Sequence, residues 1–198
     1  MSCSKRIPLH RVAGNHYECG YAIGRLTKSS IEQRIENDQA YLSSLFTFVQ
    51  TGCGQKLHED FLDVTRSQYP WYLDELRGLA DGSGISFEKI LVLNFLNETR
   101  TAYRLELERI ENETGEKGCT TVLINRREKD LFSILHNEDH AVALYETAYL
   151  IHADIQSSSY DDGQRQSPQE KFLAYCYAGG IAGDFLKYSF SSADLSLE

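Results

Sequence analysis

The chain has 198 residues, of which 41% are hydrophobic and 25% charged, so it can bury a core and is not predicted to be disordered. Its 29 acidic residues outnumber 20 basic ones, giving a net charge of −9 without any basic block. Nucleic acid and anionic membrane are therefore excluded as expected partners. Residues 1–8 hold two basic residues with no apolar run behind them, which predicts neither a secretory signal nor a membrane span. We expect a cytoplasmic protein.

Five cysteines occur, at positions 3, 19, 53, 119 and 176. Their odd number and the absence of any short repeated spacing argue against a disulfide framework and against a zinc ribbon. We therefore expect free thiols, no metal and no cofactor.

The chain before residue 118 is predicted to be mostly helical. Apolar residues between Ala22 and Val49 recur near the helical period, and the glycines of Gly52–Gly54 are expected to end that helix. A second helix is predicted over about 57–66.

Two more helices are expected further along. Pro70 suits the first turn of a helix through Leu79, and Ser86 is the expected N-cap of the next helix. The glycine pair of segment 20–24 has the spacing of a phosphate-binding loop, but the sequence shows neither the lysine nor the preceding strand that such a loop needs. Close backbone packing is the predicted use of these glycines.

After residue 118 the pattern changes to strands. Predicted strands, rich in β-branched and aromatic residues, cover 120–125, 130–136, 147–155 and 171–177. Residues 126–129 are predicted to form a hairpin turn and residues 156–169 a long exposed loop. Cys176 alternates with its neighbours as a sheet residue and is expected in the core.

The junction Gly118-Cys119-Thr120-Thr121 carries possible chemistry. If the chain were cut before Cys119, one residue would hold both a thiol nucleophile and a free α-amine to act as its base. The unperturbed pKa values of these groups, about 8.5 and roughly 7.7–8.0, allow proton exchange near neutral pH. Taken alone, the motif fits a small buried cysteine at the start of a strand better than a catalytic junction.

Three segments in order carry a resemblance to a known family. The glycine-rich segment 14–24, the helical segment 69–91, and the pair formed by 118–121 with 136–139 resemble signatures of the isopenicillin N acyltransferase family. The resemblance covers about 7–184. It is closest to the animal branch that includes the insect N-β-alanyl-dopamine and carcinine hydrolases.

The resemblance implies an α+β fold, namely the αββα sandwich of N-terminal-nucleophile hydrolases, here incomplete because the second half of the sheet is missing. It implies one domain with a helical segment over 1–118, the start of a sheet over 119–184 and a divergent tail over 185–198. The precursor is expected to cut itself between Gly118 and Cys119. The two fragments are expected to remain together as a heterodimer.

The resemblance also implies a reaction. Cys119 would attack the amide carbonyl of a small N-acyl amine, plausibly a β-alanyl amine such as N-β-alanyl-dopamine or carcinine, and hold the acyl group as a thioester for water or another acceptor. Asp139 matches an acidic position of the family's self-cleavage site, and Asn137 would form hydrogen bonds nearby. The alternative for Asp139 is a solvated turn residue. Gly118 lacks a Cβ, so its backbone can adopt strained dihedrals that expose the carbonyl.

Other interpretations of these residues are weaker. His136 and His140 have the spacing of a helical zinc pair, but the run before them is strand-like, which places residues four apart too far from one another to chelate one ion. Trp71 is expected in the core or at an interface, with a substrate wall as the alternative.

The carboxyl end departs from the family pattern. Segment 178–184 resembles the start of a family β-turn, but residues 185–198 do not continue it. By resemblance, the oxyanion-hole asparagine belongs to the missing half, so no residue is assigned to it, and its loss would lower the rate by roughly two to three orders of magnitude. The alternative function is therefore a truncated, catalytically inactive isoform that acts as a binding or regulatory partner.

Overall fold

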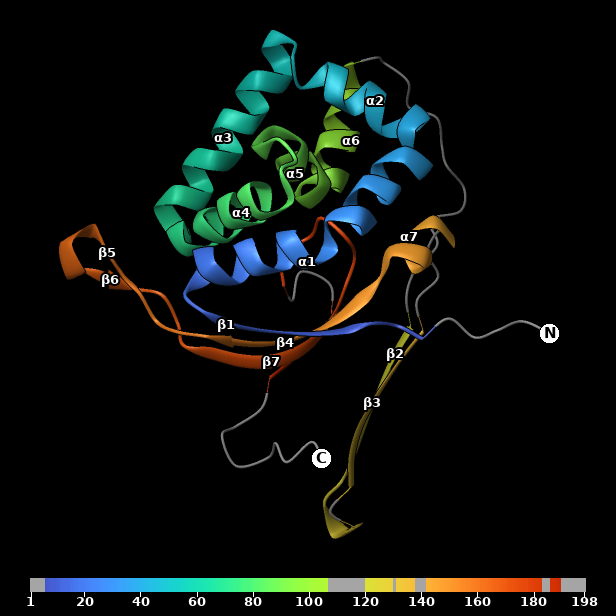
Figure 1. Cartoon of the computed structure of the whole chain (residues 1–198), viewed down its shortest axis with the longest axis vertical. Coiled ribbons are helices and arrows are strands. Elements are labelled where there is room, and N and C mark those ends of the chain that lie inside the picture. Colours follow the sequence, from blue (N-terminus) through green and yellow to red (C-terminus); the bar gives the residue numbers. More distant parts are fainter. Residues whose placement is uncertain (1–5, 107–119, 130, 138–141, 183–185, 190–198) are drawn as a thin grey trace.

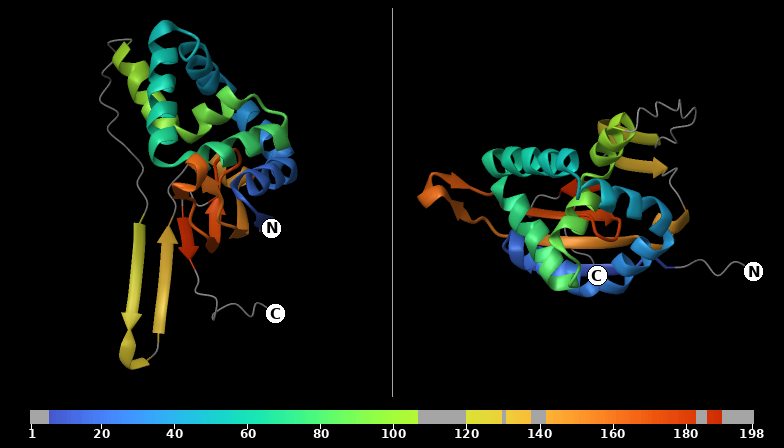
Figure 2. Two further views of the ribbon diagram at one scale, coloured as in Figure 1. Left: turned by 90° about the vertical axis from the view of Figure 1, so that its left-hand side faces the viewer. Right: turned by 90° about the horizontal axis from the view of Figure 1, so that it is seen from above.

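The computed structural model describes residues 6–106, 120–129, 131–137, 142–182 and 186–189. The helices that precede residue 107 lie on one face of a four-stranded sheet, as Figure 1 shows. A hairpin formed within residues 120–137 extends away from this body in both Figure 1 and the left view of Figure 2. Helices and sheet are thus mixed in a way that fits the predicted α+β class.

The helices are α1 (His16–Asn37), α2 (Gln39–Phe48), α3 (Gly52–Gln68), α4 (Pro70–Ser83), α5 (Phe87–Asn94), α6 (Leu96–Glu106) and α7 (Val142–Thr147). The strands are β1 (Leu9–Gly14), β2 (Thr120–Arg126), β3 (Leu131–Asn137), β4 (Tyr149–Ile155), β5 (Ser159–Tyr160), β6 (Arg165–Gln166), β7 (Glu170–Cys176) and β8 (Leu186–Ser189). Two 3-10 turns, Arg127–Lys129 and Asp161–Gly163, complete the described elements.

Local side chains determine where several helices begin. Asn15 caps α1 in a capping box, because its side chain accepts from the Glu18 N–H and the Glu18 carboxylate accepts from the Asn15 N–H, both at 2.9 Å. Pro70 occupies the first turn of α4, as predicted. The predicted N-cap Ser86 is confirmed, since its Oγ accepts from the Lys89 N–H at 3.5 Å. Gly84, in the left-handed region at φ 71°, ends α4.

The prediction of one helix over 22–49 ended by Gly52–Gly54 is wrong in two respects. The helix is interrupted at Asp38, so α1 and α2 are separate. The glycines form the first turn of α3, where the Thr51 Oγ1 accepts from the Gly54 N–H at 3.2 Å. A capping side chain satisfies an orphan donor at this point, and this local contact outweighs the low helix propensity of glycine.

The main sheet has the order β1-β4-β7-β8. β4 runs antiparallel to β7, and β7 runs antiparallel to β8, whereas β1 is parallel to β4. The strands predicted over 147–155 and 171–177 are confirmed to within two residues as β4 and β7. β1 was not predicted because it is an edge strand in which only Val12 is buried, so the sequence lacks a clear alternation.

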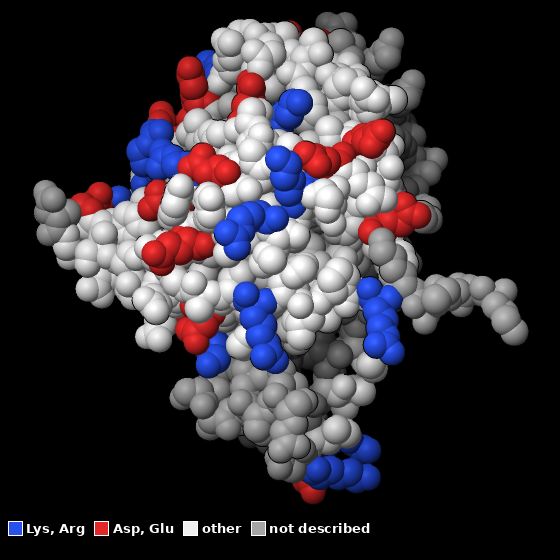
Figure 3. Space-filling view, in the orientation of Figure 1, with Lys and Arg blue, Asp and Glu red and all other residues white. Residues whose placement is uncertain are grey.

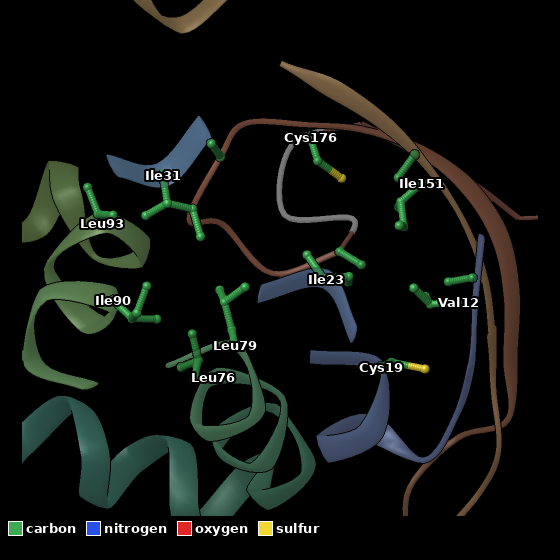
Figure 4. Packing of buried hydrophobic residues seen from close by; sticks show 14 of the residues in the cluster. Val12, Cys19, Ile23, Ile31, Leu76, Leu79, Ile90, Leu93, Ile151 and Cys176 are labelled. Atoms are coloured by element: carbon green, nitrogen blue, oxygen red, sulfur yellow. The ribbon is translucent and has the colours of Figure 1, made fainter. Parts of the chain in front are cut away.

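The core lies between the sheet and the helices. Figure 4 shows Ile151 and Cys176 on the sheet facing Ile23 of α1 and Leu79 of α4. Every second residue of β4, beginning with Tyr149, is buried, which is the alternation of a strand with one face on a core. Cys176 is 2% exposed, which confirms its predicted place in the core.

Glycines allow α1 and α4 to approach closely. A Cβ on Gly20 would lie 2.1 Å from the Glu75 carbonyl oxygen, and a Cβ on Gly78 would lie 2.1 Å from the Tyr17 carbonyl oxygen. Gly24 in turn faces the Leu79 carbonyl oxygen. From Gly20 to Gly24 of α1, the facing residue of α4 changes from Glu75 to Leu79, so the two helices run parallel. Close backbone packing by the glycines of segment 20–24 is thus confirmed.

The region predicted as a long loop over 156–169 contains the small hairpin of β5 and β6. Its Tyr160 hydroxyl donates to the Asp74 carboxylate of α4 at 2.9 Å, and Arg165 donates to the Ser67 carbonyl oxygen. These contacts with distant residues order a polar, glycine-containing segment whose local sequence alone predicts a loop.

Candidate functional site

The hairpin of β2 and β3 carries the described part of the predicted self-processing site. Thr120 lies opposite Asn137, and Thr121 lies opposite His136. The described ladder therefore ends at the residue that directly follows Cys119 in the sequence. Residues opposite each other in an antiparallel pair share a face, and successive residues alternate. Asn137 thus belongs to one face of the ribbon, whereas His136 and Thr121 belong to the other.

Of the predicted site residues, Asn137 is described and is exposed at the end of β3. Gly118, Cys119 and Asp139 lie outside the described residues. His140, the second histidine of the alternative metal pair, also lies outside them. The roles given to these residues stay predictions.

His136 and Thr121 form a contact that the sequence analysis did not identify. The Thr121 Oγ1 lies 2.9 Å from the His136 Nδ1, within hydrogen-bonding distance. The turn predicted over 126–129 would pair Thr121 with residue 134, whereas the observed register pairs it with His136. The pair is solvent-accessible, with Thr121 exposed and His136 half-buried, so groups on the same face can reach it.

The ribbon also exposes apolar side chains on both faces. Val122 and Leu135, opposite each other, are 47% and 56% exposed, and Leu123 on the other face is 67% exposed. An isolated two-stranded hairpin is marginally stable in water, so apolar residues on both sides are suited to packing. We therefore assign these three side chains to packing.

A buried polar network lies in the main body. The His16 Nδ1 is 2.9 Å from the Glu75 Oε2, and the two side chains are 0% and 1% exposed. The Glu75 Oε1 accepts a hydrogen bond from the Ala182 N–H at 3.0 Å. Because water and substrate cannot reach this pair, its role is to position the chain.

Polar side chains also bind backbone groups of the turn after β7, residues 178–182. The Arg34 Nη1 donates to the Ala178 carbonyl oxygen at 2.6 Å. Asn94 donates to the Gly179 carbonyl oxygen at 2.8 Å and accepts from the Ile181 N–H at 3.0 Å. Side chains from α1, α4 and α5 thus satisfy backbone groups that have no secondary structure of their own. The sequence signal was a polar residue on the apolar face of each helix.

Cys19 is unsuited to be a nucleophile. Burial raises the pKa of its thiol to about 12, and the negative charges of Glu75, Glu18 and Asp154 act in the same direction. The thiolate is the reactive species, so a thiol with this pKa is inert near neutral pH. Cys19 is 0% exposed and serves as a core residue.

Trp71 lies in an aromatic cluster at the start of α4. Its ring centroid is 5.9 Å from that of Tyr69, 6.0 Å from that of Tyr72 and 6.1 Å from that of Tyr160. Tyr160 belongs to the β5–β6 hairpin, so the cluster joins this hairpin to α4. Trp71 is half-buried, and its contacts are compatible with the predicted core or interface role.

The surface shows no concentration of one charge on the face in Figure 3, where basic and acidic side chains are interspersed. Within the described ranges, no group of three or more His, Cys, Asp or Glu residues is arranged to hold a metal ion. A search of the helices in the same part of the chain found none with the length and apolarity needed to cross a membrane.

Comparison with known proteins gives a match over most of the chain. Over 177 residues, 89% of this chain, the sequence is 27% identical to the beta-alanyl-dopamine/carcinine hydrolase of Drosophila melanogaster. The aligned part covers 44% of that protein, so the chain spans less than half the length of this curated relative. No family model matches the chain. The similarity to a hydrolase extends over most of the chain.

Proposed function

We propose that this chain is the precursor region of a self-processing N-terminal-cysteine amidohydrolase or acyltransferase that acts on a small N-acyl amine. The observation that carries the proposal is the similarity, over 89% of the chain, to a beta-alanyl-dopamine/carcinine hydrolase. The proposed substrates are accordingly amides of β-alanine with an aromatic or imidazole amine. The isopenicillin N acyltransferase family is the proposed wider relationship.

Cys119 is the proposed nucleophile and Gly118-Cys119 the proposed cleavage site. In self-cleavage, the thiol attacks the Gly118 carbonyl, the peptide bond becomes a thioester, and water releases the Gly118 carboxylate. This frees the α-amine of Cys119. Asp139 is proposed to orient or protonate groups at the scissile bond.

In turnover, the freed α-amine accepts the thiol proton and the thiolate attacks the substrate amide. The amine product leaves, and water or another acceptor takes the acyl group from the thioester. Asn137 is proposed to hydrogen-bond at this site. Its position opposite Thr120, at the described end of the ladder, is compatible with that role.

The two fragments, 1–118 and 119–198, are proposed to stay together as a heterodimer. The register of the main sheet supports this, because β1 of the first fragment pairs with β4 of the second from Leu9–Leu150 to Gly14–Ile155. The Glu75–Ala182 hydrogen bond joins the same two fragments.

An αββα sandwich is the proposed complete fold. Helices cover one face of the β1-β4-β7-β8 sheet (Figure 1). On β4 and β7 the alternate residues Leu150, His152 and Leu173, which point away from the core, are only half-buried. A face of this composition is suited to a second sheet.

Intact-mass measurement of purified protein tests the proposal. We expect two species, split before Cys119, and a single uncut species for Cys119→Ala. Cleaved protein is then assayed with N-β-alanyl-dopamine and with carcinine, and release of β-alanine is measured. The Cys19→Ala variant is the matched control, because that thiol is buried and protonated.

The outcomes separate the two functions. Cleavage with Cys119-dependent release of β-alanine supports the hydrolase. Cleavage without turnover of any N-acyl amine would favour a catalytically inactive chain that lacks the oxyanion-hole residue. An uncut, inactive chain would favour the alternative, an inactive isoform that acts as a binding or regulatory partner.

A further inference from the structure

Helix α6 is held to the other helices by few buried side chains. Of its 11 residues, Thr99 is fully buried, whereas Ala102 and Tyr103 are half-buried and pack against an apolar cluster that includes Phe48 and Val92. A helix of this length is marginal in water by itself, so its place depends on these contacts. α6 is therefore suited to local release while the rest of the chain stays folded.

The buried partner of Thr99 is His58 of α3. The His58 Nε2 lies 3.4 Å from the Thr99 Oγ1, and the two residues are 6% and 0% exposed. The imidazole ring is also 6.1 Å from the ring of Phe61, which stacks on Phe95 with centroids 4.7 Å apart. The imidazole thus lies between a neutral hydroxyl and an aromatic surface.

This site disfavours a charged imidazole. Burial lowers the pKa of His58, and the charge of Glu88, at the start of α5, acts in the opposite direction with a smaller effect. Glu88 is exposed and accepts a hydrogen bond from the Gln50 Nε2 at 2.5 Å, so water screens its charge. Within the described part of the chain, α4 and α6 supply no charged group that alters the pKa of His58.

We propose that the contact between His58 and Thr99 is an acid-sensitive switch, in which protonation of His58 weakens the docking of α6 on α3. A charged imidazole in this site lacks the hydration that it regains when α6 moves away. His16 of α1 is also buried, but the Glu75 carboxylate lies 2.9 Å from its Nδ1 and can pair with a charged ring. The packing of α1 on α4 is therefore expected to withstand the same change of pH. The inference goes beyond the proposed function and does not depend on it.

The direction and the size of the effect follow from proton linkage. The unperturbed pKa of imidazole is about 6.5, and the pKa of His58 is lower while α6 is docked. Docking is thus at full strength above about pH 6.5 and weakens as the pH falls from there toward the lower pKa. At pH 5.5 a hydrated imidazole is charged about ten times more often than it is neutral, so docking weakens by at most about tenfold.

Hydrogen exchange of the full chain at pH 7.5 and 5.5 tests the switch. The measured quantity is the protection factor, which removes the intrinsic effect of pH on exchange. We expect the amides of α6 to lose about threefold to tenfold of their protection at pH 5.5, and those of α1 and α4 to lose less than about twofold. His58→Gln should abolish the change at α6. His136→Gln, on the hairpin that extends away from the helices, is the matched control and should retain it.

Two further measurements keep the test decisive if His58→Gln fails to fold. The imidazole resonances of His58 in the unaltered chain should titrate with a midpoint below pH 6.5. Thr99→Val should lower the protection of α6 already at pH 7.5, because it removes the hydroxyl that His58 contacts. A midpoint at or above pH 6.5 would overturn the inference. So would protection of α6 that does not change with pH, equal losses in α1, α4 and α6, or an unchanged pH dependence in His58→Gln.

Discussion

The Glu75 carboxylate joins two parts of the chain that are 107 positions apart. One oxygen is 2.9 Å from the His16 Nδ1, and the other accepts from the Ala182 N–H at 3.0 Å. α1, α4 and the turn after β7 therefore meet at one buried carboxylate. A buried acidic group that loses one partner leaves the others unsatisfied, so each contact depends on the rest.

Replacement of Glu75 by alanine is the first prediction. We expect Glu75→Ala to lower the free energy of unfolding by about 3–5 kcal/mol, because it leaves buried polar partners unpaired. Urea denaturation measures the change. Arg77 lies on the same helix and forms an ion pair with Asp74, and its side chain is 53% exposed. Arg77→Ala should therefore lower the free energy of unfolding by less than about 1 kcal/mol. Equal effects of the two substitutions would show that burial of Glu75 contributes nothing.

The second prediction concerns the glycine contact between α1 and α4. Gly20→Ala would place a Cβ 2.1 Å from the Glu75 carbonyl oxygen, so the helices must separate. We expect a loss of about 1–3 kcal/mol or more, as for other overpacked sites. Gly52→Ala in the first turn of α3 meets nothing within 4 Å and should be neutral or stabilising. Thermal unfolding of both variants checks this, and a stable Gly20→Ala protein would contradict it.

Local signals in the sequence predict some elements well. The hydroxyl of Ser86 and the ring of Pro70 mark helix starts, and the alternation over 147–155 marks β4, because each depends on residues near in sequence. β1 depends on a parallel partner some 140 positions away, from Leu9 to Leu150, and no local pattern encodes such pairing.

In the candidate site, too, the features that depend on local sequence were predicted and those that depend on distant partners were not. The junction at Cys119 was visible as a motif, and two strand patterns with a turn predicted the hairpin of β2 and β3, but not the register that places His136 opposite Thr121. The hydrogen bonds of Glu75 and Asn94 to the turn after β7 were not predicted. They join segments 85 or more positions apart, and a polar residue on a helix does not reveal its distant partner.

The third prediction tests how Asn94 holds that turn. Asn94→Ala removes the acceptor of the Ile181 N–H and the donor to the Gly179 carbonyl oxygen. We expect faster hydrogen exchange at the Ile181 amide and a loss of about 1–3 kcal/mol in stability. Asn97→Ala, exposed on α6, is the matched control and should change neither. Unchanged exchange at Ile181 would show that the turn does not depend on Asn94.

The last prediction concerns the exposed thiol of Cys53. Partial desolvation raises the pKa of this thiol, and the charge and hydrogen bond of Glu106 act in the same direction. A raised pKa lowers the thiolate fraction at pH 8, so Glu106→Gln should increase it and speed alkylation of Cys53. Because a thiolate of lower pKa is also a weaker nucleophile, we expect the alkylation rate of Cys53 to rise by only about twofold to threefold.

The advantage of Glu106→Gln should disappear as the pH rises above the pKa of Cys53, where the thiol is ionised in both proteins. Peptide mapping after timed alkylation measures the rate at Cys53 separately from the other cysteines. Glu59→Gln, an exposed change on α3, is the control for a general loss of negative charge and should leave the rate unaltered. Buried Cys19, whose pKa is raised to about 12, should remain unlabelled in all three proteins until urea unfolds them. Equal rates for Glu106→Gln and Glu59→Gln at pH 8 would show that Glu106 does not control this thiol.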